Sequence, residues 1–297
     1  MHSGINDVTV AIPVYNEVEF IEAAVLSIVN QVEEVIICDN CSIDGTVDIL
    51  KELEQKFDNI TLILQDKNYG ASNSAKILFG NVKTKYMMCM GGHDLVPSNY
   101  VEALLNILKK DKDVIFACSP VEKIDEDDNS FEYDEMKTLM QGISSDNQFQ
   151  RVNAVIKDLI DCSIFYGLTY TEAYLDSVDY TNEACPDHIF ICSMAAKGKY
   201  KQCKDTRFYR RYLNRHDSNF EYMKRLNGDV SSNSNKHDLS YMIKAQLNII
   251  DSIETSNNEE KKYYCELART SLKNRFAGRG GWIDYRPVVD LCKFESD

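Results

Sequence analysis

The sequence predicts an α/β fold with a mostly parallel sheet flanked by helices, and two observations support this prediction. Within the first 120 residues, short apolar and β-branched runs alternate with segments of helical periodicity. Strands that alternate with helices in this way are typical of βαβ units. The chain is also 297 residues long and 44% apolar, which suits one large domain with an appendage.

Five strands and four helices are expected in this region. The strands are predicted at Val8–Val14, Val35–Cys38, Ile60–Leu64, Tyr86–Met90 and Val114–Ala117. The helices are predicted at Val18–Gln31, Asp44–Phe57, Ala71–Phe79 and Ser98–Lys110, the last with Ser98 as its N-cap. Right-handed crossovers would place these helices on both faces of the sheet.

The remainder of the chain has a more mixed pattern. The stretch Glu122–Glu135 carries eight acidic residues and one Lys, and we interpret it as a solvated loop rather than a binding segment. Helices are predicted at Gln150–Ile160 and His188–Lys197, and a short strand at Ser163–Tyr170. The tail from about Asp238 has a helical pattern. We therefore expect a main domain over residues 1–220 and a helical C-terminal extension over residues 221–297.

Composition limits the classes of function. A formal net charge of −14 argues against a protein that coats nucleic acid, because phosphate contacts need an excess of Lys and Arg. The sequence has no uncharged apolar stretch of about 18 residues, and its N-terminus does not resemble a secretion signal. The ten Cys are scattered, several within apolar runs, and the one CxxC pair, Cys38 and Cys41, lacks the second pair of a zinc site. These features predict a cytoplasmic protein in a reducing compartment.

Polar residues follow each of the first four predicted strands. In an open parallel sheet, ligands bind beyond the carboxyl ends of the strands. The four polar blocks are Pro13–Glu17, Asp39–Thr46, Asp66–Gly70 and Gly91–Asp94. Each block alone is compatible with turn formation, but their convergence on one rim predicts a ligand site, with a nucleotide as the expected class.

Two common kinds of nucleotide site are excluded by the absence of their motifs. The sequence has neither the GxGxxG of a dinucleotide site nor the GxxxxGK[ST] of a P-loop. A site built from carboxylates and amides remains. In such a site Asp39 could accept a hydrogen bond from a base N–H or a ribose hydroxyl, and Tyr15 could stack on the base.

The polar blocks also carry a resemblance to a known family. VAIPVYNE, VIICDNCSIDGT, DKNYG and YMMCMGGHDLVPSNY, taken in this order and spacing, resemble the motifs of family 2 glycosyltransferases of the GT-A fold. Further along, IFYGLTYTEAY, CPDHIFICSMAAKGKY and FYRRYLNRH are similar to sugar transferases of bacterial capsule and lipopolysaccharide synthesis. The resemblance implies a mostly parallel, Rossmann-like sheet. It also implies transfer of a sugar from a nucleotide-diphosphate donor, expected to be UDP-linked, to a hydroxyl of a glycan or lipid-linked acceptor.

The resemblance implies roles for individual residues of the rim. The nucleotide-binding residues would be Pro13, Tyr15, Glu17, Asp39, Asn68, Gly70, Lys76, Gly92 and His93, with Asp39 on the base and Lys76 near the diphosphate. The block Gly91–Asp94 takes the place of the DxD motif. That motif holds Mg²⁺ or Mn²⁺ against the diphosphate of the donor.

The sequence departs from the family pattern at the metal loop, which reads Gly-Gly-His-Asp and offers one carboxylate. Three interpretations follow. Asp94, with His93 or His216, could hold a metal ion. The enzyme could instead act without metal, using Lys or Arg on the diphosphate. In the third interpretation transfer activity is lost, which leaves a catalytically silent nucleotide-binding protein with this fold.

An inverting transferase also needs a carboxylate that accepts the proton of the acceptor hydroxyl. The resemblance places this base within Glu183–His188, and we choose Asp187, with Glu183 as the substitute. The alternative for Asp187 is to stabilise the start of the predicted helix through its charge.

Two basic regions complete the candidates. Arg210 and Arg211, in a cluster with Arg207 and Arg215, fit a clamp on the donor diphosphate or on an acidic acceptor, and fit a solvated surface strand equally well. The segment Lys261–Arg286 has a net charge of +5 and includes Phe276 and Trp282. It suits peripheral contact with the inner face of the plasma membrane, or simply an exposed helical face. The tail helices could also pack against a second copy of the chain.

Overall fold

The structure is a computed structural model that describes residues 5–178, 186–213, 237–238, 240–276 and 283–284. These residues group into two compact units. The first unit comprises Met1–Glu135, Ser163–Leu175 and Lys201–Val230, and the second comprises Met136–Cys162, Asp176–Tyr200 and Ser231–Asp297. The predicted boundary at residue 220 does not coincide with this division, because helices from the middle of the chain group with the tail helices.

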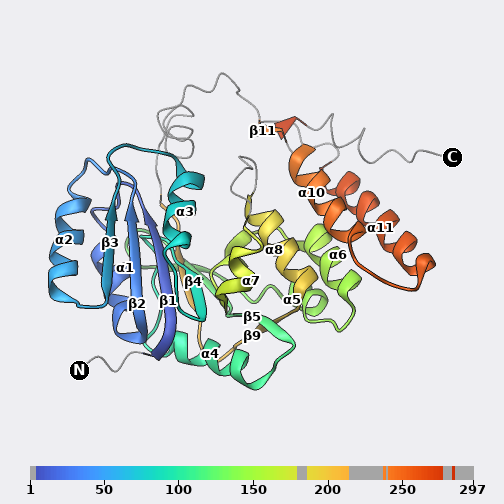
Figure 1. The fold of residues 1–297 in the computed structure, drawn as a ribbon, viewed down its shortest axis with the longest axis horizontal. Helices are drawn as coiled ribbons and strands as arrows, with labels where there is room; N and C mark the ends of the chain where they lie inside the picture. The colour runs from blue at the N-terminus through green and yellow to red at the C-terminus, as the bar shows by residue number, and fades with distance from the viewer. Residues whose placement is uncertain (1–4, 179–185, 214–236, 239, 277–282, 285–297) are drawn as a thin grey trace. The chain divides into compact units, whose positions relative to one another are not determined.

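A seven-stranded sheet is the centre of the fold. Its strands are β1 (Ile5–Val14), β2 (Val32–Asp39), β3 (Ile60–Leu64), β4 (Tyr86–Cys89), β5 (Val114–Cys118), β8 (Leu168–Tyr170) and β9 (Lys199–Gln202). Their order is β3-β2-β1-β4-β8-β5-β9, and Figure 1 shows β1, β2 and β3 side by side. The first four strands pair in parallel, whereas β8 is antiparallel to both β4 and β5. The predicted α/β class and the five predicted strands are confirmed.

The direction of winding reverses at β1. From β1 the chain moves outward to β2 and β3, and then returns to place β4 on the other side of β1. Such a reversal is a topological switch point, where the loops at the carboxyl ends of adjacent strands diverge and leave a crevice. The interior of β1 is fully buried, with Val10, Ala11 and Ile12 at 0% exposure, as expected for a strand covered on both faces.

Four helices connect these strands, as predicted. They are α1 (Ile21–Ile28), α2 (Thr46–Lys56), α3 (Ala71–Gly80) and α4 (Tyr100–Lys110). α1 starts later than predicted because the backbone N–H groups of Phe20 and Ile21 bond to the carbonyl of Glu17 and form a turn first. The residue at the N-cap of α4 is Asn99 and not Ser98, because a turn from Pro97 to Tyr100 precedes the helix.

The acidic stretch is a β-hairpin rather than the predicted loop. β6 (Val121–Ile124) and β7 (Ser130–Asp134) pair antiparallel, and β10 (Phe208–Arg211) joins β6 in parallel to complete a three-stranded sheet. The residues of β7 are mainly exposed. An antiparallel strand with a face in water accommodates charged residues without apolar runs, which explains why the sequence pattern did not indicate it.

The second unit is mainly helical. Its helices are α5 (Lys137–Ile143), α6 (Gln148–Asp158), α8 (Pro186–Lys197), α10 (Ser240–Asp251) and α11 (Asn258–Phe276). α6 packs against α5, α8, α10 and α11, and α10 also packs against α8. Short strands β11 (His237–Asp238) and β12 (Ile283–Asp284) pair with each other. Helices α10 and α11 lie within the predicted helical tail.

Two arginines, Arg151 and Arg275, donate to carbonyls at helix ends of the second unit. Arg151 is 6% exposed, and its Nε donates to the carbonyl of Ala195 near the end of α8 at 2.8 Å. Arg275 donates to the carbonyls of Val155 and Ile156 near the end of α6, at 3.4 and 2.9 Å. The last carbonyls of a helix lack partners within the helix, and a cationic donor satisfies them and their negative dipole end.

Smaller elements connect these parts. A 3₁₀ turn (Val29–Gln31) follows α1, and another (Cys162–Phe165) precedes β8, where the sequence predicted a strand from Ser163 onward. α7 (Thr171–Leu175) follows β8. Among the cysteines of the described residues, none forms a disulfide, and this includes Cys38 and Cys41.

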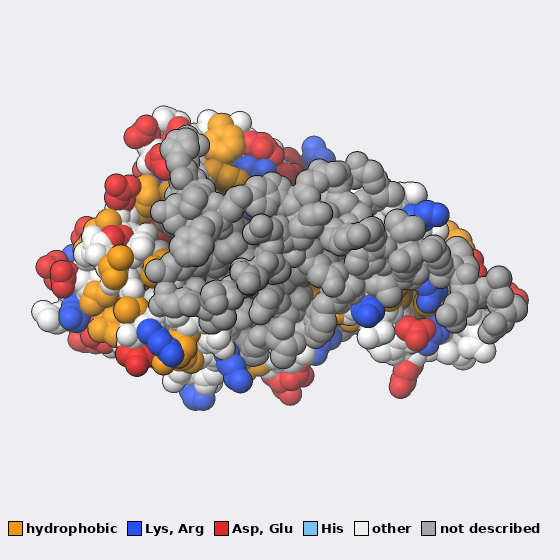
Figure 2. All heavy atoms as spheres, turned by 90° about the horizontal axis from the view of Figure 1, so that it is seen from above, with side chains coloured by type: hydrophobic (Ala, Val, Ile, Leu, Met, Phe, Trp, Pro, Cys, Tyr) orange, Lys and Arg blue, Asp and Glu red, His pale blue; other side chains and the backbone are white. Residues whose placement is uncertain are grey.

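Surface charge and hydropathy add two observations. In Figure 2, acidic and basic side chains are interspersed over the described part of the face shown, despite the net charge of −14. Among the described residues, no helix combines the length and the apolar character that crossing a bilayer requires.

Candidate functional site

The polar blocks that follow β1 to β4 lie beside one another at the switch point of the sheet, as predicted. The strand register aligns Val14 of β1 with Asp39 of β2, and Ala11 of β1 with Cys89 of β4. The blocks therefore begin at similar heights on one edge. We call the four blocks, Pro13–Glu17, Asp39–Thr46, Asp66–Gly70 and Gly91–Asp94, the rim.

Main-chain to side-chain hydrogen bonds join the first two blocks. The backbone N–H of Glu17 donates to Thr46 Oγ1 at 2.9 Å, and that of Asn16 donates to Ser42 Oγ at 2.8 Å. Asn16 Oδ1 in turn accepts from the backbone N–H of Ile43 at 3.0 Å. Because these bonds run in both directions between the loops, the end of β1 and the start of α2 hold each other in place.

Asp44 caps this arrangement at the start of α2. Its Oδ1 accepts from the N–H and Oγ1 of Thr46 at 3.1 and 2.5 Å, and its Oδ2 accepts from the N–H of Val18 at 3.2 Å. Burial raises the pKa of Asp44, but these hydrogen bonds outweigh it, so the net shift is downward. The carboxylate is thus held in its charged form at the positive end of the helix.

Asp39, the predicted base-binding residue, is 1% exposed at the end of β2. Its Oδ2 accepts from the backbone N–H of Ser42 at 2.9 Å, and its Oδ1 accepts from Ser42 Oγ at 2.5 Å. These bonds fix the carboxylate, and its two oxygens together have about four lone-pair sites, so acceptor capacity remains. Pro13 and Tyr15, also predicted for the pocket, are half-buried near the end of β1.

The third block is tied to the second by two amides. Asn40 Nδ2 donates to Asn68 Oδ1 at 2.6 Å, and the backbone N–H of Tyr69 donates to Asn40 Oδ1 at 2.8 Å. Asn68 Oδ1 also accepts from the N–H of Gly70 at 2.9 Å. Gly70 has a φ of +82°, a conformation that only glycine adopts readily, and α3 begins at the next residue. Lys76, predicted to approach a diphosphate, is exposed on α3.

The fourth block is closely packed around its two glycines. A Cβ on Gly91 would lie 2.5 Å from Asp94 Oδ2, and one on Gly92 would lie 3.3 Å from Glu17 Cγ. His93 Nδ1 lies 3.1 Å from Glu17 Oε1, which links this block to the first. With Nδ1–H as the donor, the neutral ring would keep Nε2 as an acceptor.

Asp94 is the carboxylate of the predicted metal loop and is 1% exposed. Its Oδ1 accepts from the backbone N–H of Arg211 at 3.0 Å, whereas its Oδ2 is buried and has no hydrogen-bond partner among the described residues. Burial raises the pKa of Asp94, and the charge of His93 and the Arg211 N–H lower it in part. A buried carboxylate oxygen without a partner is costly, so it favours a proton or a cation beside it.

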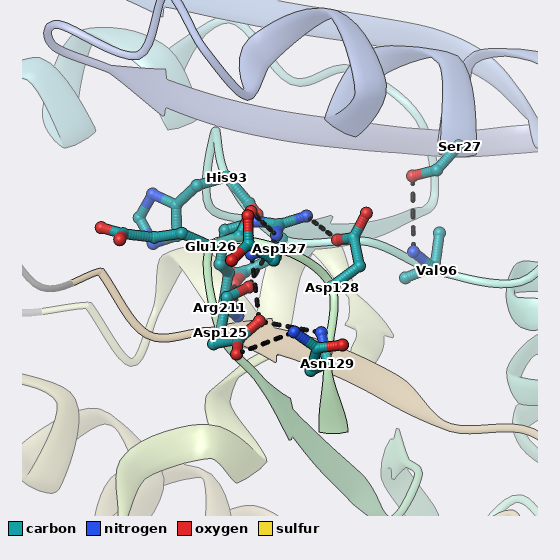
Figure 3. A network of polar contacts seen from close by, with 10 residues as sticks. Ser27, His93, Val96, Asp125, Glu126, Asp127, Asp128, Asn129 and Arg211 are labelled. Atoms are coloured by element: carbon teal, nitrogen blue, oxygen red, sulfur yellow. Dashed lines mark hydrogen bonds and ion pairs between the residues drawn. The ribbon is translucent and has the colours of Figure 1, made fainter. Parts of the chain in front are cut away.

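The side chain of Arg211 is hydrogen-bonded to other groups of the protein and is not exposed to solvent. Its side chain is 3% exposed, and its Nε donates to the carbonyl of His93 at 2.9 Å. Its other nitrogens donate to the turn between β6 and β7, as Figure 3 shows. Arg210 is half-buried, donates to Ser163 Oγ at 2.6 Å and lies over the rings of Tyr166 and Tyr212. These contacts fit the predicted diphosphate or acceptor role less well for Arg211 than for Arg210.

Few of the described side chains near Asp94 could ligate a metal ion. Within the part of the chain that the structure describes, no three His, Cys, Asp or Glu side chains come together as a metal site. Asp94 and His93 are adjacent, but His93 Nδ1 faces Glu17. His216, the third predicted ligand, lies outside the described residues. The described side chains alone therefore do not make a complete metal site.

The predicted base belongs to the second unit. Asp187 lies in the first turn of α8 and is exposed, and Glu183 lies outside the described residues. His188 is adjacent to Asp187 in the sequence, and burial and the charge of Arg275 lower its pKa to about 4. His188 is therefore neutral near pH 7.

Sequence reasoning missed several residues that shape the rim. Asn40, Asp44 and Thr46 lie within the second block, but no individual roles were predicted for them. An Asp shortly before a predicted helix could have indicated that its carboxylate bonds to the first turn, as Asp44 does to Thr46. The contact of Arg211 with the acidic turn joins residues more than 80 positions apart. No local sequence pattern could have indicated that contact.

Comparisons with known proteins agree with this geometry. The model of the family described as "Glycosyl transferase family 2" matches residues 9–174, which is more than half of the chain. Among curated relatives, a cholesterol galactosyltransferase of Borreliella burgdorferi is 32% identical over 115 residues, 38% of this chain and 32% of that protein. Glycosyltransferase AglE of Haloferax volcanii is 34% identical over 76 residues, 24% of this chain and 25% of that protein. The match thus spans a third or less of these relatives.

Solved structures extend the likeness over most of the chain. The crystal structure of S. aureus TarS residues 1–349 has a TM-score of 0.63 at 11% identity, covering 90% of this chain and 72% of that one. The same protein in complex with UDP gives a TM-score of 0.62 at 10% identity, covering 91% and 72%. The likeness at this identity concerns the fold, which is the GT-A fold. With the family model matched over the rim and the sheet, this chain belongs to glycosyltransferase family 2.

Proposed function

We propose that this chain transfers a sugar from a UDP-linked donor to a hydroxyl of a glycan or lipid-linked acceptor in surface polysaccharide synthesis. The observation that carries the proposal is the rim, where four strand-end blocks of a family 2 chain are hydrogen-bonded to one another at the switch point. Complexes of S. aureus TarS with UDP and with UDP-GlcNAc support a UDP-linked donor, because that protein shares the fold.

In this proposal the rim binds the nucleotide. Asp39 accepts a hydrogen bond from the N–H of the uracil ring while Ser42 holds the carboxylate in place. Tyr15 and Pro13 pack against the nucleoside, and the Asn68–Gly70 segment borders it. The diphosphate lies toward the fourth block, near Gly92 and His93, with Lys76 and Arg210 as the cationic groups that approach it.

The chemical step follows from the needs of inversion. The carboxylate of Asp187 accepts the proton of the acceptor hydroxyl as that oxygen attacks the anomeric carbon. The new glycosidic bond forms on the face opposite the leaving group, and the bond to the diphosphate breaks to release UDP. Asp187 suits this role because it is an exposed carboxylate beside a histidine that is neutral at pH 7.

A divalent cation would offset the charge that develops on the leaving diphosphate. Asp94 is the residue that would hold it, because its Oδ2 is buried without a hydrogen-bond partner. One carboxylate is a small donor set even when substrate phosphates complete the sphere. We therefore assign no step of the reaction to a metal ion, and treat the metal as a separate proposal.

A second candidate is a nucleotide-binding protein with this fold that lacks transfer activity. The observation that favours it is the same loop, since Gly91–Asp94 offers one carboxylate where the family usually has two or three. Both candidates share the rim and its nucleotide, and they differ in turnover. The proposed cytoplasmic location, contact of Lys261–Arg286 with a membrane face, and self-association do not separate the two candidates.

Turnover separates the two candidates. Release of UDP from a panel of UDP-sugars would be measured with wild type, with Asp187→Asn, and with added Mn²⁺ or a chelator. For the transferase, Asp187→Asn lowers the rate about 100-fold or more while donor affinity is unchanged, because general-base catalysis acts on the chemical step. No UDP release by wild type with any donor and acceptor, despite UDP binding, would establish the silent protein.

Glu259→Gln is a matched control for this experiment. Glu259, like Asp187, is an exposed acid in the first turn of a helix of the second unit, α11. Removing it changes the charge at a helix start by the same amount, so it should leave the rate within about twofold. Equal losses in both variants would reduce Asp187 to the helix-stabilising role.

A further inference from the structure

The side chain of Arg211 connects the rim to the acidic hairpin. Its Nε donates to the carbonyl of His93 at 2.9 Å. Its NH1 donates to the carbonyls of Asp125 and Glu126 at 2.8 and 3.2 Å, and its NH2 donates to Asp128 Oδ1 at 2.5 Å. Figure 3 shows these residues gathered around the guanidinium. One side chain on β10 thus bridges two loops that are distant in sequence.

The acidic turn is shaped to receive this guanidinium. Within the turn, Asp125 Oδ1 accepts from the backbone N–H groups of Asp127 and Asn129 at 3.0 and 2.8 Å. These bonds lower the pKa of Asp125 and keep it charged. They also fold the turn so that its carbonyls, rather than its carboxylates alone, face Arg211.

The chemistry of arginine matches this set of acceptors. A buried cation is costly unless its donors are satisfied, and the guanidinium has five N–H groups in a rigid fork. Three of its acceptors here are main-chain carbonyls and one is a carboxylate that is 64% exposed. Lysine, with a single nitrogen, could not reach both loops at once. The contacts therefore depend on the shape of the side chain as much as on its charge.

The main chain of Arg211 also contacts the His93–Asp94 loop, at Asp94. The backbone N–H of Arg211 donates to Asp94 Oδ1 at 3.0 Å, so His93 and Asp94 are both held from one position on β10. A paired bridge between Leu95 and Tyr209, with N···O distances of 3.0 Å in both directions, extends this contact. The guanidinium also lies 4.8 Å from the ring of Phe20, just after the first block of the rim.

We propose that Arg211 is a positioning residue that locks the His93–Asp94 loop to the acidic turn Asp125–Asn129, and that donor binding depends on this lock. The second part rests on the proposed function, because it places the donor against this loop. Arg211 acts through His93 and Asp94 and does not itself contact the nucleotide. The acidic stretch, which the sequence suggested was a plain solvated loop, serves as the anchor.

Arg207 provides a matched comparison on the same strand segment. It precedes β10, donates to Glu122 Oε2 at 2.7 Å and lies over the ring of Tyr133. Its side chain is 49% exposed, against 3% for Arg211, and no contact of Arg207 with the rim is found among the described residues. Both residues are arginines that pair with the hairpin. They differ in that Arg211 also contacts the His93–Asp94 loop, which is the contact that the proposal invokes.

The lock is tested by amide hydrogen exchange on the full chain without ligand. In Arg211→Met we expect the amides of Asp94, Asp127 and Asn129 to exchange about tenfold or more faster, as loss of hydrogen bonds to a charged group implies. Asp128→Asn, at an exposed carboxylate, should show a smaller change in the same amides. Arg207→Met should leave them unchanged. Wild-type exchange at these amides in Arg211→Met and Asp128→Asn would overturn the lock.

Donor coupling is tested by UDP titration and by transfer kinetics. Arg211→Met should raise the UDP dissociation constant about tenfold and the donor KM similarly, with acceptor KM unchanged, and Arg211→Lys should fall between it and wild type. Faster exchange with unchanged UDP affinity would overturn the coupling. If wild type fails to bind UDP, the coupling falls with the proposed function, while the exchange data still decide the lock. If Arg211→Met does not fold, Asp128→Asn decides both.

Discussion

The first unit and the second unit bury polar groups for different purposes. In the first, buried polar side chains at the rim bond to one another across loops, as Asn40 does to Asn68 and Glu17 to His93. In the second, a buried and a half-buried arginine, Arg151 and Arg275, donate to the carbonyls at helix ends. The rim bonds position loops at the carboxyl ends of the strands, whereas the helix-end bonds stabilise packed helices. Substitutions should therefore affect ligand binding in one unit and stability in the other.

The largest effect on stability is expected from His188 in the second unit. Burial and Arg275 lower its pKa in the folded chain from 6.5 to about 4. Between these pH values the unfolded chain binds the proton and the folded chain does not. The contribution of neutral His188 to the free energy of unfolding should thus be fully present above pH 6.5. The free energy of unfolding should fall by up to about 3 kcal/mol as the pH drops to 4. Urea unfolding of wild type at pH 7.5, 5.5 and 4.5 measures this.

His188→Gln is the control, because glutamine does not titrate in this range. The stability difference between wild type and this variant should shrink steadily from pH 7.5 to pH 4.5 while UDP affinity at pH 7.5 is the same in both. A pH-independent difference would show that the imidazole is not buried as a neutral ring, and that the stated contrast is wrong for α8.

The next effect tests helix packing in the second unit. A Cβ on Gly142 in α5 would lie 2.2 Å from the Cβ of Ala154 in α6, so Gly142→Ala forces these helices apart. We expect a loss of about 1–3 kcal/mol through overpacking, although alanine favours a helix by itself. Thermal or urea unfolding measures the loss. Gly80→Ala in α3, where a Cβ meets nothing within 4 Å, should be neutral or slightly stabilising.

Substitutions at the rim are expected to have the smallest effect on stability. Their effect on UDP binding should be larger than that of the substitutions in the second unit. Asn68→Ala leaves Asn40 Nδ2 and the N–H of Gly70 without their acceptor, which should cost about 1–2 kcal/mol of stability. Since these groups order the third block, UDP affinity should fall about tenfold. Titration calorimetry with UDP, alongside urea unfolding, measures both. A variant destabilised like Gly142→Ala but with wild-type affinity would contradict the contrast between the units.

Sequence patterns were informative where local physics determines the structure. The strands from Val8 to Met90 were predicted within a few residues because each is an apolar, β-branched run between turn residues, and the rim followed from their polar ends. The hairpin at Val121–Asp134 was missed because exposed charged strands lack an apolar pattern. The boundary at residue 220 differs because α10 and α11 pack on α6 and α8, which lie earlier in the chain.

The candidate site divides in the same way. Asp39, Asn68 and Gly70 were indicated by their positions after strands, and the structure brings them into one rim. The second role found for Arg211, as a bridge to Asp125 and Asp128, depends on a long-range contact that no spacing in the sequence encodes. The assignments of Asp187 as base and Asp94 as metal ligand come from the family resemblance and stay predictions.

The central claim is that the rim of the first unit binds the nucleotide of a UDP-sugar. A crystal structure of the full chain with UDP, grown with and without Mn²⁺, tests it most directly. The account predicts uracil within hydrogen-bond distance of Asp39, with the diphosphate beside the His93–Asp94 loop. UDP bound elsewhere, or no binding at millimolar UDP in a parallel titration, would contradict it.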